Sequence, residues 1–426
     1  MPALAATLTD TTLTSEPYLR RALNANLRVG SREAVDRIAA FAADVKRPEA
    51  LRVEAVSILG VWAAPSPLDR VDGFYLTPYA VQPASTTPRD SAAARAAVER
   101  MLASVPADTT EKVKVALAEA AGRSGAAGAA PALLAMLKND ASQQVRLTAL
   151  EALRLTKAGN PDELMQIAFA DKSPAVRRAA IAILPTLPLS AAAKTQQLAT
   201  LYANGSTAEK QGVIEVLGNL KSPESRQVLQ GYVDQLNAGT LAPELQVDLL
   251  EAVQADGSEG LAKGLETYRT AKKADTLVQA FAEALTKGGD LRSGQRVVSD
   301  NPAAECTRCH TIRGRGSDVG PDLSRIGSTL TRPQLVESLL APNARIAPGF
   351  GVVSLTLKNG DKADGTLRSE TDTEVVLLTG TPPVERKIAK TDIASRTDPV
   401  SAMPPLGLIL KPREVRDLVE FLAGMR

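Results

Sequence analysis

The stretch Cys306-Thr307-Arg308-Cys309-His310 decides how the C-terminal part of this 426-residue chain is organised. It contains both cysteines and the single histidine of the whole sequence. Two thiols separated by two residues can bond to the two vinyl groups of one porphyrin, and the imidazole that follows can bind the iron. The pentapeptide is therefore a signature of covalent haem attachment, with Cys306 and Cys309 as the thioether positions and His310 as an iron ligand.

Three other interpretations of the pentapeptide can be weighed against haem attachment. A structural zinc site needs four protein ligands, and the sequence has no second pair of Cys or His to complete it. A thioredoxin-like redox pair would follow a strand, whereas residues 294–305 predict a short helix that runs into a turn. A structural disulfide between Cys306 and Cys309 remains open for an exported protein to which no haem is attached.

A second axial iron ligand is expected to be a methionine, because the sequence has no second histidine. The candidate is Met403, in Ser401-Ala402-Met403-Pro404-Pro405-Leu406-Gly407, where two prolines stiffen the backbone and exclude helix. The other internal candidates fall at apolar positions of predicted helices and are Met101, Met136 and Met165. Met425 is expected in a frayed terminus. If Met403 does not bind iron, it is an ordinary loop methionine.

The segment after Met403 predicts a helix that closes the C-terminal domain. Pro412 suits a first helical position. An apolar helix face follows, formed by Val415, Leu418, Val419 and Leu422. Before the pentapeptide, Gly294 lies in a short predicted helix, and its small size should let the closing helix approach closely near Phe421.

Between the pentapeptide and Met403 the sequence predicts extended structure. Residues 352–358 are β-branched and alternating, Asn359-Gly360-Asp361 is a turn signal, and residues 362–368 resume the extended pattern. Further strands are predicted at residues 374–379, 384–388 and 391–395. We therefore expect a small inserted β-barrel or sheet at about residues 350–397, without a catalytic constellation.

Upstream of residue 290 the sequence repeats one helical pattern and resembles HEAT-like repeats. The copies are residues 51–59, 145–153 and 176–184, with weaker copies at 113–121, 209–217 and 245–253. One such unit cannot bury its apolar face alone, so neighbours are expected to stack into an array with extended protein-binding faces. The fold class we expect is mainly α, with an α-solenoid over residues 1–290. An all-α haem-binding domain that carries the β insertion should follow over residues 291–426.

An irregular, Pro-rich stretch interrupts the repeats at residues 62–79. It contains the single tryptophan, Trp62, and the aromatic residues Phe74, Tyr75 and Tyr79. This stretch could dock a partner protein. Packing against the chain's own helices is favoured, because clustered aromatic side chains are usually buried.

Residues 293–426 resemble the haem-binding domain described mainly from planctomycetes and verrucomicrobia, which is itself similar to class I cytochrome c with an insertion. The matching stretches are the pentapeptide, Gly316-Ser317-Asp318-Val319-Gly320-Pro321-Asp322-Leu323-Ser324-Arg325-Ile326-Gly327, and Ser401-Ala402-Met403-Pro404 with the closing helix. The resemblance implies haem c with His310 as proximal and Met403 as distal iron ligand. It also implies that the carbonyl of Pro321 accepts the other imidazole N–H. From the residues alone, Gly320-Pro321-Asp322 is only a turn.

A haem held by His310 and Met403 is expected to carry electrons. The thioether ligand raises the reduction potential, and full coordination leaves no open position for a substrate, so peroxidase-like catalysis is disfavoured. We expect an electron carrier and not an enzyme, with a dehydrogenase as donor and a respiratory protein as acceptor. The alternative is a helical-repeat scaffold that binds a partner protein, with the haem as an accessory group or redox sensor.

Charge and hydropathy restrict the partners and the location. The chain has 50 Lys and Arg against 48 Asp and Glu, so its net charge of +2 gives no basis for binding nucleic acid. No apolar run is long enough to cross a bilayer. Covalent haem attachment of this type predicts a periplasmic or otherwise extracytoplasmic location. Residues 1–16 lack the basic and apolar regions of an export signal, so we expect the native protein to begin upstream. In the resembled family a β-propeller similar to sugar dehydrogenases often lies there.

Overall fold

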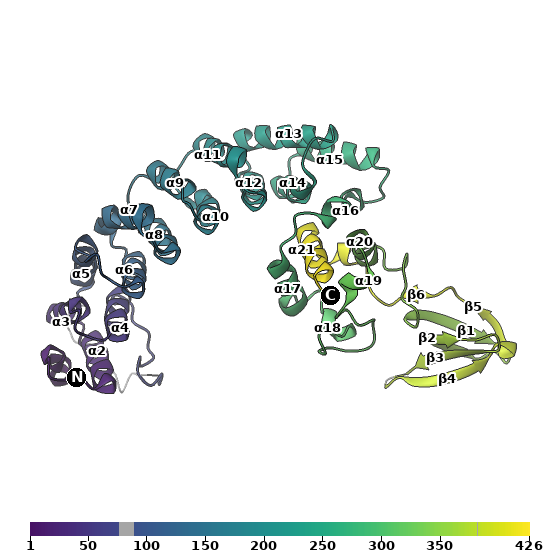
Figure 1. Cartoon of the computed structure of the whole chain (residues 1–426), viewed down its shortest axis with the longest axis horizontal. Helices are drawn as coiled ribbons and strands as arrows, with labels where there is room; N and C mark the ends of the chain where they lie inside the picture. The colour runs from purple at the N-terminus through teal and green to yellow at the C-terminus, as the bar shows by residue number, and fades with distance from the viewer. Residues whose placement is uncertain (76–88, 381) are drawn as a thin grey trace. The chain divides into compact units, whose positions relative to one another are not determined.

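The computed structural model describes residues 1–75, 89–380 and 382–426, which are mainly helical with one small antiparallel sheet (Figure 1). The expected mainly α class is confirmed at this level. Contacts within the chain divide it into two compact units, Met1–Leu201 and Tyr202–Arg426. Among the described helices, none combines the length and the apolar character that a membrane span requires.

The first unit consists of short helices joined by tight turns. They are α1 (Pro2–Ala6), α2 (Glu16–Val29), α3 (Arg32–Ala43), α4 (Glu49–Gly60), α5 (Ser91–Ala103), α6 (Glu111–Ser124), α7 (Ala130–Asn139), α8 (Gln143–Thr156), α9 (Pro161–Phe169), α10 (Pro174–Ile183) and α11 (Ala191–Asn204), with 3-10 turns η1 (Thr7–Thr9), η2 (Ala127–Ala129) and η3 (Leu184–Thr186). The segments of this unit that were expected to be helical, residues 51–59, 113–121, 145–153 and 176–184, fall in α4, α6, α8 and α10, the last one extending into η3. These four pack against one another in chain order, α4 on α6, α6 on α8 and α8 on α10.

A buried ion pair between Arg146 and Asp171 links two successive turns of this unit. Arg146 Nε lies 2.7 Å from an Asp171 carboxylate oxygen, and both side chains are almost fully buried. The same guanidinium donates to the carbonyls of Asp140 and Ala141, at 2.9 and 3.0 Å. Asp171 in turn accepts the N–H of Ser173 at 2.7 Å. One arginine therefore fixes the spacing between the turn before α8 and the turn before α10.

The aromatic stretch meets the sequence expectation only in part. Trp62 is 1% exposed, as expected, but Phe74 and Tyr75 are 73% and 63% exposed, so packing on the helices is wrong for them. The turn that carries these two residues is anchored by Asp69 instead, which accepts a hydrogen bond from Asn24 Nδ2 at 2.7 Å. Residues 76–79 of the stretch, which include Tyr79, lie outside the described residues.

The second unit joins further helices to the segment that carries the pentapeptide. Its helices are α12 (Thr207–Leu220), α13 (Pro223–Asn237), α14 (Pro243–Asp256), α15 (Glu259–Ala271), α16 (Leu277–Ala280), α17 (Leu291–Asp300), α18 (Cys306–Cys309), α19 (Ile326–Thr329), α20 (Arg332–Leu340) and α21 (Pro412–Ala423), with 3-10 turns η4 (Ala284–Thr286), η5 (Lys390–Asp392) and η6 (Leu406–Leu408). Helices α12 and α14 contain the remaining predicted repeat helices. The domain boundary expected near residue 290 lies inside this unit, in which α14 packs against α21.

Helix α21 is the predicted closing helix and is surrounded by α17, α19 and α20 (Figure 1). Pro412 is its first residue, as expected. The predicted apolar face is buried and comprises Val415, Leu418, Val419 and Leu422. Met425 is 2% exposed, so the expectation of a frayed terminus is wrong. The chain end is held because the carbonyl of Met425 accepts the N–H of Gly327 at 2.9 Å.

The expected close approach at Gly294 is confirmed. A Cβ at this position would lie 2.0 Å from the carbonyl oxygen of Asp417 and 2.8 Å from Cβ of Phe421. Gly294→Ala would push α17 and α21 apart, and we expect it to lower the free energy of unfolding by about 1–3 kcal/mol in urea titrations of the full chain. The control is Gly231→Ala in α13, where nothing lies within 4 Å. A Gly294 variant as stable as this control would contradict the close contact.

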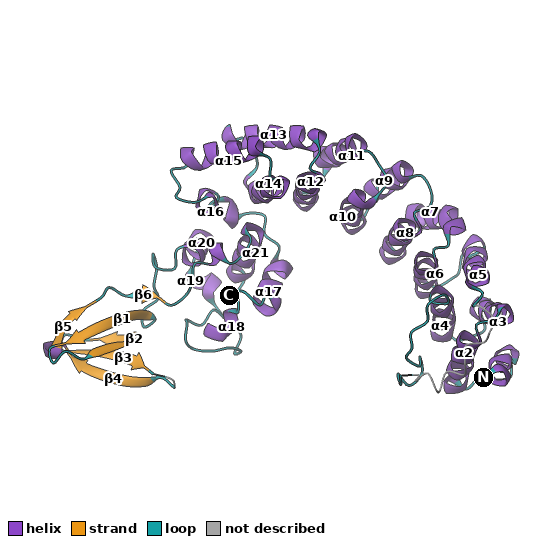
Figure 2. Ribbon diagram, turned by 180° about the vertical axis from the view of Figure 1, so that it is seen from behind, coloured by secondary structure: helices purple, strands orange, loops and turns teal. Residues whose placement is uncertain are grey.

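The predicted β insertion is confirmed as a six-stranded antiparallel sheet (Figure 2). Its strands are β1 (Gly351–Leu357), β2 (Lys362–Glu370), β3 (Glu374–Thr379), β4 (Val384–Ala389), β5 (Ile393–Arg396) and β6 (Val400–Ser401). The order is β4-β3-β2-β1-β5, with β6 also paired to β1. Alternation along the strands gathers one apolar cluster, formed by Val353, Leu355, Ala363, Val375, Leu377 and Ile388.

Candidate functional site

Cys306, Cys309 and His310 lie in and directly after the single turn of α18 (Cys306–Cys309). The N–H of His310 donates to the carbonyl of Cys306 at 2.9 Å, which closes the turn and brings the imidazole next to the two thiols. Both cysteines are free; Cys309 is exposed and Cys306 is partly buried. Burial raises the pKa of the Cys306 thiol. The local geometry therefore presents two separate thiols and one imidazole on a single turn.

The imidazole of His310 is oriented by the Gly320-Pro321 segment. Its Nδ1 lies 2.8 Å from the carbonyl oxygen of Pro321, the contact that the family resemblance implies. Gly320 lies against the same ring, because a Cβ there would be 2.7 Å from Cε1 and 2.8 Å from Nδ1. With Nδ1 bonded to a carbonyl, Nε2 is the nitrogen left to bind a metal.

Backbone hydrogen bonds tie the 311–325 loop to the pentapeptide. The N–H of Gly320 donates to the carbonyl of Cys309 at 2.6 Å, and the N–H of Leu323 donates to the carbonyl of Thr311 at 2.9 Å. The sequence prediction gave a role to Pro321 but missed Gly320. The position of Gly320 directly before Pro321 could have indicated it, because glycine is typical where the backbone approaches another group closely.

Met403 lies in the loop between β6 and η6. Its N–H donates to Ser401 Oγ at 3.1 Å, and the N–H of Ser401 donates to Asn343 Oδ1 at 2.7 Å. The residue is half-buried, and Pro404 and Pro405 follow it directly. These contacts fix the backbone of the loop, while the joint role of Met403 and His310 stays a prediction.

The donor set fits covalently bound haem better than a bare metal ion. Within residues 1–75, 89–380 and 382–426, no group of three or more His, Cys, Asp and Glu side chains is placed to hold a metal. A porphyrin supplies its own nitrogen ligands, so one imidazole and two thiols suffice to hold it. Val319, beside Gly320, is 62% exposed, and Leu408, after Met403, is 84% exposed. Exposed apolar side chains in the segments that carry His310's partner Pro321 and Met403 suit an apolar macrocycle.

Comparisons with known proteins give little further information. No protein-family model and no curated protein matches the sequence. Among solved structures, human deoxyhypusine hydroxylase in complex with glycerol is similar at 18% sequence identity, with a TM-score of 0.28, over 67% of this chain and 94% of that one. A TM-score this low supports no conclusion about fold or activity.

Proposed function

We propose that this chain is an extracytoplasmic c-type cytochrome that transfers electrons between protein partners. The observation that carries the proposal is the Cys306–His310 turn together with the 2.8 Å contact between His310 Nδ1 and the carbonyl of Pro321. Cys306 and Cys309 would form the two thioether bonds to haem c, and His310 Nε2 and the Met403 sulfur would bind its iron. When bound, this haem supplies a reversible one-electron couple.

The residues around the haem have distinct roles in this proposal. The carbonyl of Pro321 accepts the Nδ1–H of His310, which holds the ring orientation and increases the donor strength of Nε2. The thioether of Met403 would favour the reduced state of bound haem iron and would leave no open position for water or substrate. An outer-sphere electron carrier therefore suits this site better than an enzyme.

We also propose that residues 1–290 form HEAT-like repeats and residues 291–426 a cytochrome c domain with the inserted sheet. The successive packing of α4, α6, α8 and α10 and the buried Arg146–Asp171 link support the repeats. Arrays of this kind bind proteins, and the proposed partners are a dehydrogenase donor and a respiratory acceptor. The exposed Phe74 and Tyr75 favour the second candidate function, a protein-binding scaffold with an accessory or sensory haem.

The direct experiment is an absorption spectrum of the full chain, oxidised and reduced, after export with the cytochrome maturation machinery. Haem that stays on the polypeptide in acid solvent, with a sharp low-spin reduced spectrum, would support the electron carrier. Protein without haem would leave Cys306 and Cys309 as a disulfide pair and would favour the scaffold.

Met403→Ala tests the distal ligand. Loss of the thioether should abolish the thioether-to-iron absorption and lower the midpoint potential, because a softer ligand no longer stabilises the reduced iron. Both are measured on the haem-loaded full chain by absorption spectroscopy and redox titration. Met136→Ala in α7 is the matched control and should change neither. An unchanged spectrum and potential in the Met403 variant would rule the assignment out.

A further inference from the structure

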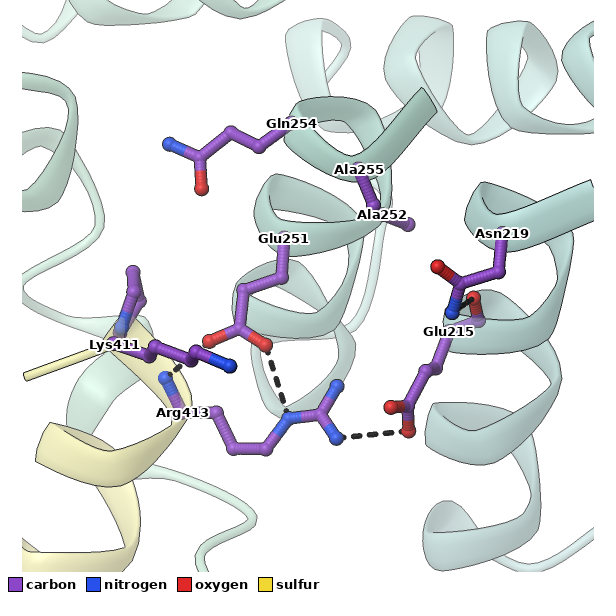
Figure 3. Close-up of a pocket in the computed structure, with 9 residues that line it drawn as sticks. Glu215, Asn219, Glu251, Ala252, Gln254, Ala255, Lys411 and Arg413 are labelled. Atoms are coloured by element: carbon purple, nitrogen blue, oxygen red, sulfur yellow. Dashed lines mark hydrogen bonds and ion pairs between the residues drawn. The ribbon is translucent and has the colours of Figure 1, made fainter. Parts of the chain in front are cut away.

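The first turn of α21 is held by carboxylates from two other helices (Figure 3). The N–H of Arg413 donates to Glu251 Oε1 at 2.7 Å, and Arg413 Nε lies 3.0 Å from Glu251 Oε2. The same guanidinium lies 2.8 Å from Glu215 Oε2. Glu251 belongs to α14 and Glu215 to α12. We call Glu215, Glu251 and Arg413 the α21 clasp.

The clasp combines two different interactions in Glu251. One oxygen binds a backbone N–H at the start of α21, a group that has no partner within the helix, and a carboxylate there is also favoured by the helix dipole. The other oxygen binds the Arg413 side chain. Glu251 therefore fixes both the position of the helix start and the direction of its first side chains.

Glu414, which follows Arg413, connects the first turn of α21 to residues 301–305, the segment directly before the pentapeptide. Glu414 accepts the N–H of Lys411 at 2.8 Å through one oxygen and Asn301 Nδ2 at 3.1 Å through the other. Asn301 directly follows α17, and its Oδ1 accepts the N–H of Ala303 at 2.9 Å. The carbonyl of Asn301 accepts the N–H of Ala304 at 3.2 Å. Asn301 thus shapes the turn that leads directly into Cys306.

We propose that Glu251 is a positioning residue for the haem-attachment turn, acting through the first turn of α21 and the Glu414–Asn301 hydrogen bond. The helix that supplies it, α14, lies in the predicted repeat region, so this contact couples the repeats to the pentapeptide. The role toward haem rests on the proposed function, but the coupling of Glu251 to residues 301–310 does not require haem.

Solvent reaches the α21 clasp, so the strength of its ion pairs should depend on ionic strength. It lines a cleft of about 370 Å³ that also includes Asn219 and Gln254 (Figure 3), and the Arg413 side chain is 29% exposed. Exposed ion pairs weaken as ionic strength rises, whereas the hydrogen bond to a backbone N–H is less sensitive. Salt should therefore loosen the Arg413 side chain before it releases the helix start.

Hydrogen exchange of the amides of residues 301–310 tests the proposal on the full chain as purified, with or without attached haem. We expect Glu251→Ala to speed exchange there about tenfold, the effect of losing a charge-assisted hydrogen bond. Glu251→Gln keeps an acceptor for the Arg413 N–H, so we expect a smaller increase. Glu266→Ala is the matched control, because it removes an exposed α15 carboxylate paired with Arg269 at 2.7 Å.

Two results would overturn the proposal. In the first, Glu251→Ala leaves exchange at residues 301–310 equal to that of the Glu266→Ala control. In the second, exchange rises equally at all amides of residues 202–426, which would make Glu251 only a general stabilising residue. Rapid exchange of residues 301–310 in the parent protein would count against the coupling as well.

Spectroscopy distinguishes the two parts of the proposal, the effect of Glu251 on bound haem and its coupling to residues 301–310. In haem-loaded protein, Glu251→Ala should shift the midpoint potential and broaden the low-spin spectrum, while Glu266→Ala should change neither. Faster exchange without any spectral change would keep the coupling and refute the positioning role toward haem. Absence of haem in the parent protein would instead count against the proposed function and leave the exchange test intact.

Discussion

Replacing Cys306 and Cys309 together by serine is expected to abolish covalent haem attachment completely. A hydroxyl does not form the thioether bond that the cysteine sulfur makes with a vinyl group, and no other cysteine exists in the chain. His310 should still be held by Pro321, so any haem that binds would be retained only by axial ligands. Treatment with acid solvent should then extract all haem from the variant and none from the parent protein.

The matched control for this experiment is Arg308→Ala, which changes the same turn without removing a thiol. Arg308 is exposed and pairs with Glu305 at 2.8 Å, so its loss should leave haem attachment at the parent level. Haem that remains on the double serine variant after extraction would show that attachment does not use the thiols. The pentapeptide would then need another explanation.

Asp248→Ala is expected to cause the largest loss of stability in the second unit. Asp248 in α14 lies 2.6 Å from Arg416 Nη1 in α21, and the two side chains are 2% and 5% exposed. Burial raises the pKa of Asp248, which reflects the cost of removing its charge from water. Without Asp248, the buried Arg416 keeps Asp417, at 3.3 Å, as its charged partner among the described residues. We expect the free energy of unfolding to fall by about 3 kcal/mol, measured by denaturant titration of the full chain.

A double replacement distinguishes the contribution of the Asp248–Arg416 pair to the free energy of unfolding from the cost of leaving Arg416 unpaired. Asp248→Leu with Arg416→Met removes both charges and fills the space with apolar side chains. Such replacements are often neutral or stabilising, but here the buried Asp417 loses its arginine partner. We therefore expect the stability of the double variant to lie between those of Asp248→Ala and the parent protein. Glu266→Ala on the exposed face of α15 should cost less than about 0.5 kcal/mol. An Asp248→Ala variant as stable as Glu266→Ala would contradict the importance of the pair.

The features that were predictable from sequence depend on local spacing. Strands β1 to β5 of the insertion are predictable within a few residues, because alternation and a turn signal such as Asn359-Gly360-Asp361 are properties of short segments. Strand β6 lies beyond the expected range of residues 350–397, because two residues carry no alternation. The closing helix was predicted from Pro412 and its apolar face in the same way. The turn that carries Cys306, Cys309 and His310 is also local, so its candidate ligands could be named without a structure.

The features that were missed are contacts between segments far apart in the chain. Arg416 and Asp248 are 168 residues apart, and Glu414 and Asn301 are 113 residues apart. Periodicity does not predict either contact. A sequence does not show whether a charged residue is exposed or buried, or which distant residue it faces. The exposure of Phe74 and the burial of Met425 were misjudged for a similar reason, since burial depends on which distant segment packs against a residue.

Local spacing along the chain was enough to predict the mainly helical class, the strands β1 to β5 and the set of two thiols and one imidazole on one turn. Each follows from residues that are close together and therefore act through backbone geometry and side-chain periodicity. Three features became known only from the folded chain: Gly320 lies against the His310 ring, Met425 is buried, and Glu251 of α14 holds the start of α21. These contacts are decided by the packing of whole elements, in which apolar burial brings distant polar groups together and short-range hydrogen bonds then select their partners.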